Sequence, residues 1–141
     1  MRNELADRCG VVEECYEFML AYAAQGVAGE EGSGKGGQIR DFLERAVQAL
    51  AGLSDAFTAL VKQESREPAG RYRDFLAVLD RDAKDSLASI ELVLAQPAIS
   101  SQLIDNLNAS IHLRALLTDL FLIDEIVKLQ PSTAEQANAT S

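Results

Sequence analysis

Residues 100–129 constrain the fold more than any other part of the chain, because they form its longest apolar run and contain no glycine or proline. From Leu113 onward, apolar residues fall on nearly every face of a helix. A helix that is apolar all round has to be covered on all sides. We therefore predict that residues 100–129 form the central helix of a bundle, covered by the other helices or by a partner chain.

Three further segments carry the apolar periodicity of amphipathic helices, and we expect helices over residues 3–25, 38–64 and 68–96. Pro97 ends the third of these helices, and Ser100 or Ser101 is expected to cap the fourth. Helices of this length with short connections predict one all-α domain over residues 1–129, an up-down-up-down four-helix bundle.

Two segments are expected to lie outside the helices. Half of residues 26–37 are glycine, so we predict a flexible glycine-rich loop between the first two helices. Gly29 to Lys35 fits the spacing of a phosphate-binding loop, but Gly36 stands where that motif needs Ser or Thr, and a predicted helix precedes it instead of a strand. Residues 130–141 are small and polar, which predicts a disordered C-terminal tail.

The charge of the chain limits its partners. A net charge of −9 argues against binding to nucleic acid or to an anionic membrane surface, because both need a basic face. Asp119 and Asp124 interrupt the most apolar stretch, so no membrane span is predicted. Cys9 and Cys15 fall on different faces of a helix, which favours free thiols in a reducing compartment. We therefore expect a cytoplasmic protein without nucleic-acid or membrane partners.

The single histidine, His112, restricts the chemistry that a helical bundle can perform. A di-iron bundle needs a Glu-x-x-His unit on each of two helices, and covalent haem needs a CxxCH motif that this chain lacks. We expect no cofactor, no metal and no catalytic residue, and we predict that the protein is not an enzyme.

A polar stripe is predicted along the helix over residues 100–129, and it consists of Asp105, Asn108, His112 and Asp119. Asp105 and Asn108 fit a solvated stripe. Asp119 lies among apolar residues, so it needs either a partner from another element or a subunit interface. His112 fits a hydrogen-bonded structural residue, and a histidine phosphotransfer-like domain using His112 is kept as an alternative.

The function that the pattern favours is interaction, because the helix over residues 100–129 has more apolar surface than its amphipathic neighbours need. The predicted interaction residues are Leu113, Leu116, Leu120, Phe121, Ile123 and Ile126. They predict a homodimer, with another protein as the alternative partner. A small-ligand sensor is a further alternative, with a pocket near Gly10 and Gly52 lined by Tyr16, Met19, Phe57, Tyr72 and Phe75. The pattern leaves open whether the chain itself or a second subunit covers the surplus face.

Overall fold

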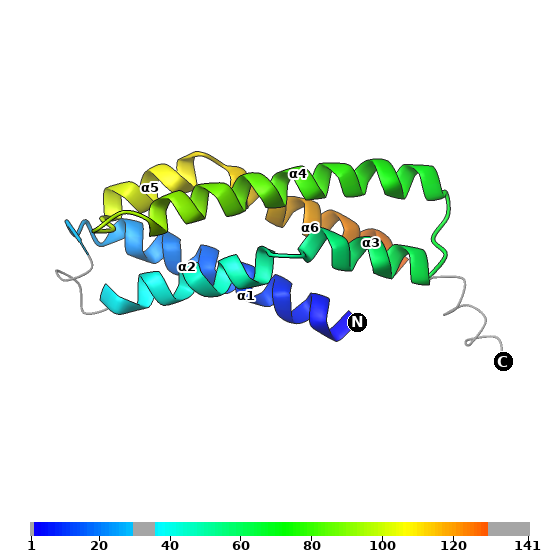
Figure 1. The fold of residues 1–141 in the computed structure, drawn as a ribbon, viewed down its shortest axis with the longest axis horizontal. Coiled ribbons are helices and arrows are strands. Elements are labelled where there is room, and N and C mark those ends of the chain that lie inside the picture. Colours follow the sequence, from blue (N-terminus) through cyan, green and yellow to red (C-terminus); the bar gives the residue numbers. More distant parts are fainter. Residues whose placement is uncertain (1, 30–35, 130–141) are drawn as a thin grey trace.

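A computed structural model describes residues 2–29 and 36–129, and Figure 1 shows them as an elongated array of helices lying side by side. The helices in these residues are α1 (Arg2–Ala24), α2 (Gly36–Leu50), α3 (Leu53–Gln63), α4 (Ala69–Leu94), α5 (Ser101–Ala109) and α6 (His112–Leu129). No strand occurs among the described residues, so the predicted all-α class is confirmed. The helices predicted over residues 3–25 and 68–96 agree closely with α1 and α4.

The helix predicted over residues 38–64 is wrong, because the chain is interrupted between α2 and α3. Gly52 has a φ of 80°, in the left-handed region that a right-handed helix cannot include. No heavy atom lies within 4 Å of the place that a Cβ would occupy at Gly52. The glycine therefore serves the turn in the backbone and not the close approach of a neighbour.

Arg8 of α1 satisfies the carbonyl groups that this interruption leaves at the end of α2. Its guanidinium Nη1 donates to the carbonyl oxygens of Gln48, Ala49 and Ala51 at 3.2, 3.0 and 2.8 Å. Glu4, one turn earlier on α1, accepts from Nε and Nη2 of Arg8 at 3.2 and 3.0 Å and holds the guanidinium in place. A basic side chain at the last carbonyls of a helix is a common C-terminal cap, and here it comes from a different helix.

The central helix predicted over residues 100–129 is also wrong as one element, since the chain forms α5 and α6 instead. Ile111 between them has a φ of 62°, an unusual value for a β-branched residue. Its N–H donates to the carbonyl of Asn108 at 3.1 Å and ends α5, while its carbonyl accepts from the N–H of Ala115 at 2.8 Å and begins α6. Residues 2–29 and 36–129 therefore form six helices where the sequence predicted four.

Hydrogen bonds fasten the beginning of α5 to the end of α1. Ser100 caps α5 as predicted, because its hydroxyl accepts from the N–H of Leu103 at 3.0 Å. The buried hydroxyl of Ser101 donates to the carbonyl of Tyr22 at 2.6 Å and accepts from the N–H of Val27 at 3.0 Å. The phenol of Tyr22 donates to the carbonyl of Ile99 at 2.5 Å. These bonds fix the residues after α1 against the residues before α5.

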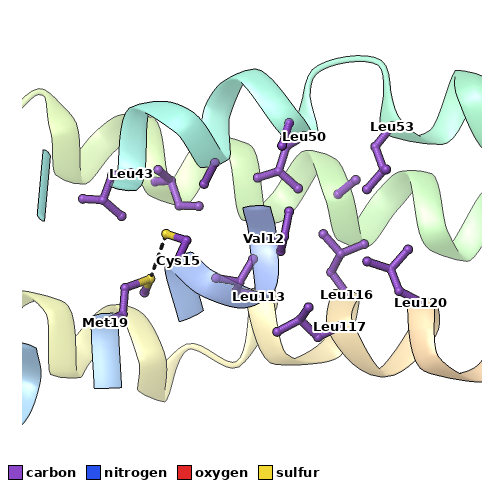
Figure 2. Packing of buried hydrophobic residues seen from close by; sticks show 14 of the residues in the cluster. Val12, Cys15, Met19, Leu43, Leu50, Leu53, Leu113, Leu116, Leu117 and Leu120 are labelled. Atoms are coloured by element: carbon purple, nitrogen blue, oxygen red, sulfur yellow. Dashed lines mark hydrogen bonds between the residues drawn. The ribbon is translucent and has the colours of Figure 1, made fainter. Parts of the chain in front are cut away.

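Aliphatic side chains from all the helices form one continuous core, part of which is drawn in Figure 2. Val12 and Cys15 of α1 point toward Leu43 and Leu50 of α2 and toward Leu113 of α6. Full burial of each such aliphatic side chain stabilises the fold by about 1.5–3 kcal/mol. Helix α1 packs chiefly against α2 and α5, whereas α6 packs chiefly against α4. The contact between α1 and α6 is less extensive than these three contacts.

The predicted glycine-rich loop and C-terminal tail fall mainly on residues 30–35 and 130–141, which lie outside the described residues. Helix α2 already begins at Gly36, so the predicted loop, which ended at residue 37, extends slightly into this helix. None of the helices in the described part of the chain is long and apolar enough to cross a membrane.

Candidate functional site: a groove between α1 and α6

The main candidate site is a pair of adjoining hollows between α1 and α6, which we name the α1–α6 groove. The larger hollow has a volume of about 470 Å³. It is lined by Leu5, Ala6, Cys9, Gly10 and Glu13 of α1, Phe57 and Leu60 of α3, and Leu120, Phe121, Ile123, Asp124 and Val127 of α6. The smaller hollow, of about 270 Å³, is lined by Glu13, Tyr16, Glu17, Arg114, Leu117, Thr118 and Phe121. Glu13 and Phe121 line both hollows, which are therefore adjacent.

Gly10 widens the larger hollow, because no heavy atom lies within 4 Å of the place that a Cβ would occupy there. A glycine inside a helix costs about 1 kcal/mol relative to alanine. The cost is not offset by closer packing of another helix against α1. Gly10 instead exposes the backbone of α1 to whatever enters the groove.

The pocket predicted for a small ligand is only partly where the structure has a hollow. Phe57 and Gly10 line the larger hollow, and Tyr16 lines the smaller one. Met19 and Tyr72 are buried in the core instead, and Phe75 is partly buried against it. The sequence therefore indicated a hollow beside Gly10 but placed most of its wall on the wrong residues.

The chain itself covers most of the six predicted interaction residues of α6. Leu113, Leu116, Leu120 and Ile123 are at most 4% exposed, and Ile126 is partly buried. Phe121 is 56% exposed and lies where the two hollows meet. Leu120 and Ile123 contribute to the wall of the larger hollow. Of the surplus apolar face inferred from the sequence, Phe121 is the part that the fold leaves open beside a hollow.

The groove carries more negative than positive charge. Glu13, Glu17 and Asp124 supply carboxylates along it, while Arg114 supplies one guanidinium. Burial, followed by the charges of Glu13 and Asp124, raises the pKa of the Cys9 thiol to about 11. At neutral pH this thiol is protonated, so it is a poor nucleophile and a poor metal ligand.

The predicted polar stripe does not lie on one continuous helix, because the interruption at Ile111 separates its members. Asp105 is exposed on α5, and Asn108 is partly buried on the same helix. The side-chain nitrogen and oxygen of Asn108 are buried without a hydrogen-bond partner among the described residues. His112 is the first residue of α6 and is partly buried. The stripe is thus divided between two helices.

Asp119 of α6 is paired with Asp82 of α4, which answers the requirement for a partner from another element. Burial, followed by the hydrogen bond to Asp82 and the charge of Asp82, raises the pKa of Asp119 to about 7. One oxygen of this carboxyl group is less well satisfied, because the buried Oδ2 of Asp119 has no hydrogen-bond partner among the described residues. Two carboxyl groups can bond to each other only when one is protonated, so this pair holds a proton near neutral pH. Asp82 was not singled out because it lies in a run of alternating charges.

Comparison with protein families, with curated proteins and with solved structures finds no match for this chain. Among the residues that the structure describes, no group of three or more His, Cys, Asp or Glu side chains could hold a metal ion.

Proposed function

We propose that this chain is a non-catalytic interaction protein that binds a protein partner through the α1–α6 groove. The observation that carries the proposal is the open hollow of about 470 Å³ with Phe121, 56% exposed, at its edge. A large aromatic side chain beside a preformed apolar hollow is the arrangement of a binding hot spot. Phe121 supplies an anchor on this protein, and the hollow accepts an apolar anchor from the partner.

The architecture that we infer around the groove is an up-down-up-down bundle in which two of the four helical columns are interrupted. Supporting this, α2 and α3 both pack against α4, and α5 and α6 follow one another back along the same array (Figure 1). In such a bundle α1 is the first column, and its looser contact with α6 opens one seam to solvent.

The test of the proposed function is site-specific photo-crosslinking in the cells that make the protein. A photoreactive phenylalanine analogue replaces Phe121 in one variant and Leu92 in a control variant. Leu92 on α4 is 67% exposed and does not line the groove. We expect a discrete crosslinked adduct from position 121 and none from position 92. Equal adducts, or none from position 121, would contradict the proposal.

Homodimerisation stays a prediction, and Phe121 together with Leu122, 49% exposed, is the apolar surface of α6 that could support it. Light scattering after size exclusion at micromolar and at near-millimolar protein measures it directly. A mass that doubles with concentration, and that returns to the 15.3 kDa monomer in the Phe121→Asp variant, supports a dimer. A monomer at every concentration contradicts it.

A small-ligand sensor is the second candidate, and the volume of the larger hollow favours it. Ligand pockets typically measure about 300–1,000 Å³, and the larger hollow of about 470 Å³ falls in that range. Native mass spectrometry of the protein purified from its source tests this candidate. A non-covalent adduct that is lost in Gly10→Leu, whose side chain occupies part of the hollow, would support a ligand.

The phosphotransfer alternative needs a fully exposed histidine, and the partial burial of His112 gives it no support.

We also propose a cytoplasmic location. Cys9 and Cys15 are free thiols in the structure, and reducing compartments keep thiols in this form. Fluorescence microscopy of a tagged chain, together with cell fractionation, is the corresponding measurement. Recovery in an oxidising compartment would contradict the proposal.

A further inference from the structure

The shape of the α1–α6 groove favours an elongated occupant. Leu5 and Val127 lie at one end of the larger hollow, and Glu17 and Arg114 lie in the smaller one. From Leu5 to Glu17 the wall formed by α1 extends about 18 Å, at about 1.5 Å per residue. The two hollows share Glu13 and Phe121 in their walls and follow one another along α1 and α6, so together they form a groove that runs parallel to these two helices. A groove of this length accommodates about three turns of an added helix.

The charge of the groove favours a basic occupant. Glu13 and Glu17 on α1 and Asp124 on α6 line it, and Arg114 is the basic residue among the described lining residues. Two of these carboxylates, those of Glu13 and Asp124, raise the pKa of the Cys9 thiol in the wall of the groove. A second copy of the chain carries the same acidic residues within a net charge of −9, so like charges oppose self-association here. Lysine or arginine on a partner would be attracted to the same surface.

We propose that the occupant of the α1–α6 groove is an amphipathic helix of another protein, with apolar residues toward the hollows and basic residues beside them. This inference rests on the proposed function and names the class of its partner. Apolar side chains of the added helix enter the larger hollow beside Gly10 and contact Phe121. Its basic side chains lie against Glu13 and Glu17. Recognition of an amphipathic helix in an apolar groove is a recurring mode of peptide binding.

The experiment is an unbiased selection of peptides from a displayed library of random 18-residue sequences. The full chain is the bait, and the Gly10→Leu variant is the counter-selection bait, because its added side chain fills the larger hollow. We expect the enriched peptides to carry apolar residues at helical spacing and a net positive charge. Enriched peptides are then synthesised, and their affinity for purified protein is measured by fluorescence anisotropy at low and high salt.

Matched variants assign the two components of binding. Phe121→Gln is expected to weaken an enriched peptide at least tenfold, as removal of a hot-spot residue does. The double variant Glu13→Gln, Glu17→Gln is expected to weaken it about three- to tenfold at low salt, with less effect at high salt. The control pair Glu91→Gln, Leu92→Gln removes the same two kinds of side chain from exposed positions of α4 and should leave the affinity unchanged.

The outcomes separate this inference from the proposed function. Basic helical peptides that depend on Phe121 and on Glu13 and Glu17 support both. Apolar peptides that depend on Phe121 but show no bias in charge overturn the basic partner and leave the groove as a binding site. Selection of no peptide that distinguishes the wild-type chain from Gly10→Leu overturns the helix inference. Failure of crosslinking at position 121 as well would overturn the proposed function itself.

Discussion

Asp82 of α4 and Asp119 of α6 place two carboxyl groups against each other across the interface between these helices, and the pair holds a proton near neutral pH. Like charges so close cannot both ionise without cost, and burial adds to that cost. The fold of this acidic protein therefore binds a proton that the unfolded chain releases at lower pH.

The pair predicts that stability falls as the pH rises from about 4 to about 7. The pKa of Asp119 is raised from 3.8 in the unfolded chain to about 7 in the fold, so in this window the folded state binds more protons than the unfolded state. Protonation stabilises the fold fully below the unfolded value, and the contribution is lost as the pH passes the folded value. Because solvent screens a partly exposed pair, we expect a loss of about 1–2 kcal/mol.

Asp119→Asn tests this pH dependence by urea unfolding between pH 4 and pH 8. The amide cannot ionise, so the variant should show a flatter profile and should be more stable than wild type at pH 8. Asp105→Asn, at an exposed position of α5, is the control and should follow the wild-type profile. An Asp119→Asn profile as steep as wild type would show that another group causes the dependence.

Gly10→Ala is expected to stabilise the protein by about 0.5–1 kcal/mol, because alanine is the better helix former and its Cβ meets no atom at this position. Gly52→Ala is expected to destabilise it by about 1–2 kcal/mol, because the φ of 80° disfavours any residue with a Cβ. Midpoints of urea unfolding compare the two. Destabilisation by Gly10→Ala would show that the hollow beside α1 is too narrow for the added methyl group.

Arg8→Ala is expected to cost about 1–2 kcal/mol, because the side chain donates to three carbonyl groups at the end of α2. Thermal unfolding measures the loss. Arg71→Ala, which removes an exposed arginine of α4, is the matched control and should change stability by about 0.5 kcal/mol or less. Equal effects of the two substitutions would indicate a general charge effect and not a cap on α2.

Cys9 and Cys15 are expected to differ in reactivity toward iodoacetamide. Cys15 is fully buried and should not react in the folded protein, while Cys9, partly buried at the groove, should react slowly because its pKa is about 11. Glu13→Gln removes one of the charges that raise this pKa and should accelerate the reaction of Cys9 about threefold, equivalent to about half a pKa unit.

Mass spectrometry of alkylated protein at pH 8 to 9 follows both thiols separately. Glu14→Gln changes an exposed residue of α1 that does not line the groove, and it should leave the rate at Cys9 unaltered. If both substitutions accelerate the reaction equally, the net charge of α1 controls the thiol and not the local field of Glu13.

The helical content was predictable because periodicity is strong in this chain, but the two interruptions were not. A single glycine is tolerated within a strongly amphipathic pattern, so Gly52 did not predict a break in the helix expected over residues 38–64. Ile111 has no glycine or proline near it, and isoleucine disfavours the positive φ that it adopts. In the fold, α5 packs chiefly on α1 and α6 packs chiefly on α4, and such contacts between distant segments cannot be read from the local sequence.

The candidate site was predictable in its components but not in its assembly. Phe121 was selected as an interaction residue, and Gly10 was noticed as a position that could leave room. Their meeting in one groove depends on how closely α1 approaches α6, which no periodicity along a single helix determines. The need of Asp119 for a partner also followed from its apolar surroundings. Prediction of its partner Asp82 would have required the register between α4 and α6, two antiparallel helices from different parts of the sequence.

The breaks between α2 and α3 and between α5 and α6 both lie near the middle of the long axis in Figure 1. Of the helices in the described residues, α1 and α4 alone pass this point without a break, and each spans both half-length sections of the molecule. One section contains α3, α6 and the larger hollow, and the other contains α2, α5 and the hydrogen bonds of Ser101. The backbone hydrogen bonding of α1 and α4 therefore runs past the level at which the other two helical columns break, and one continuous core fills both sections.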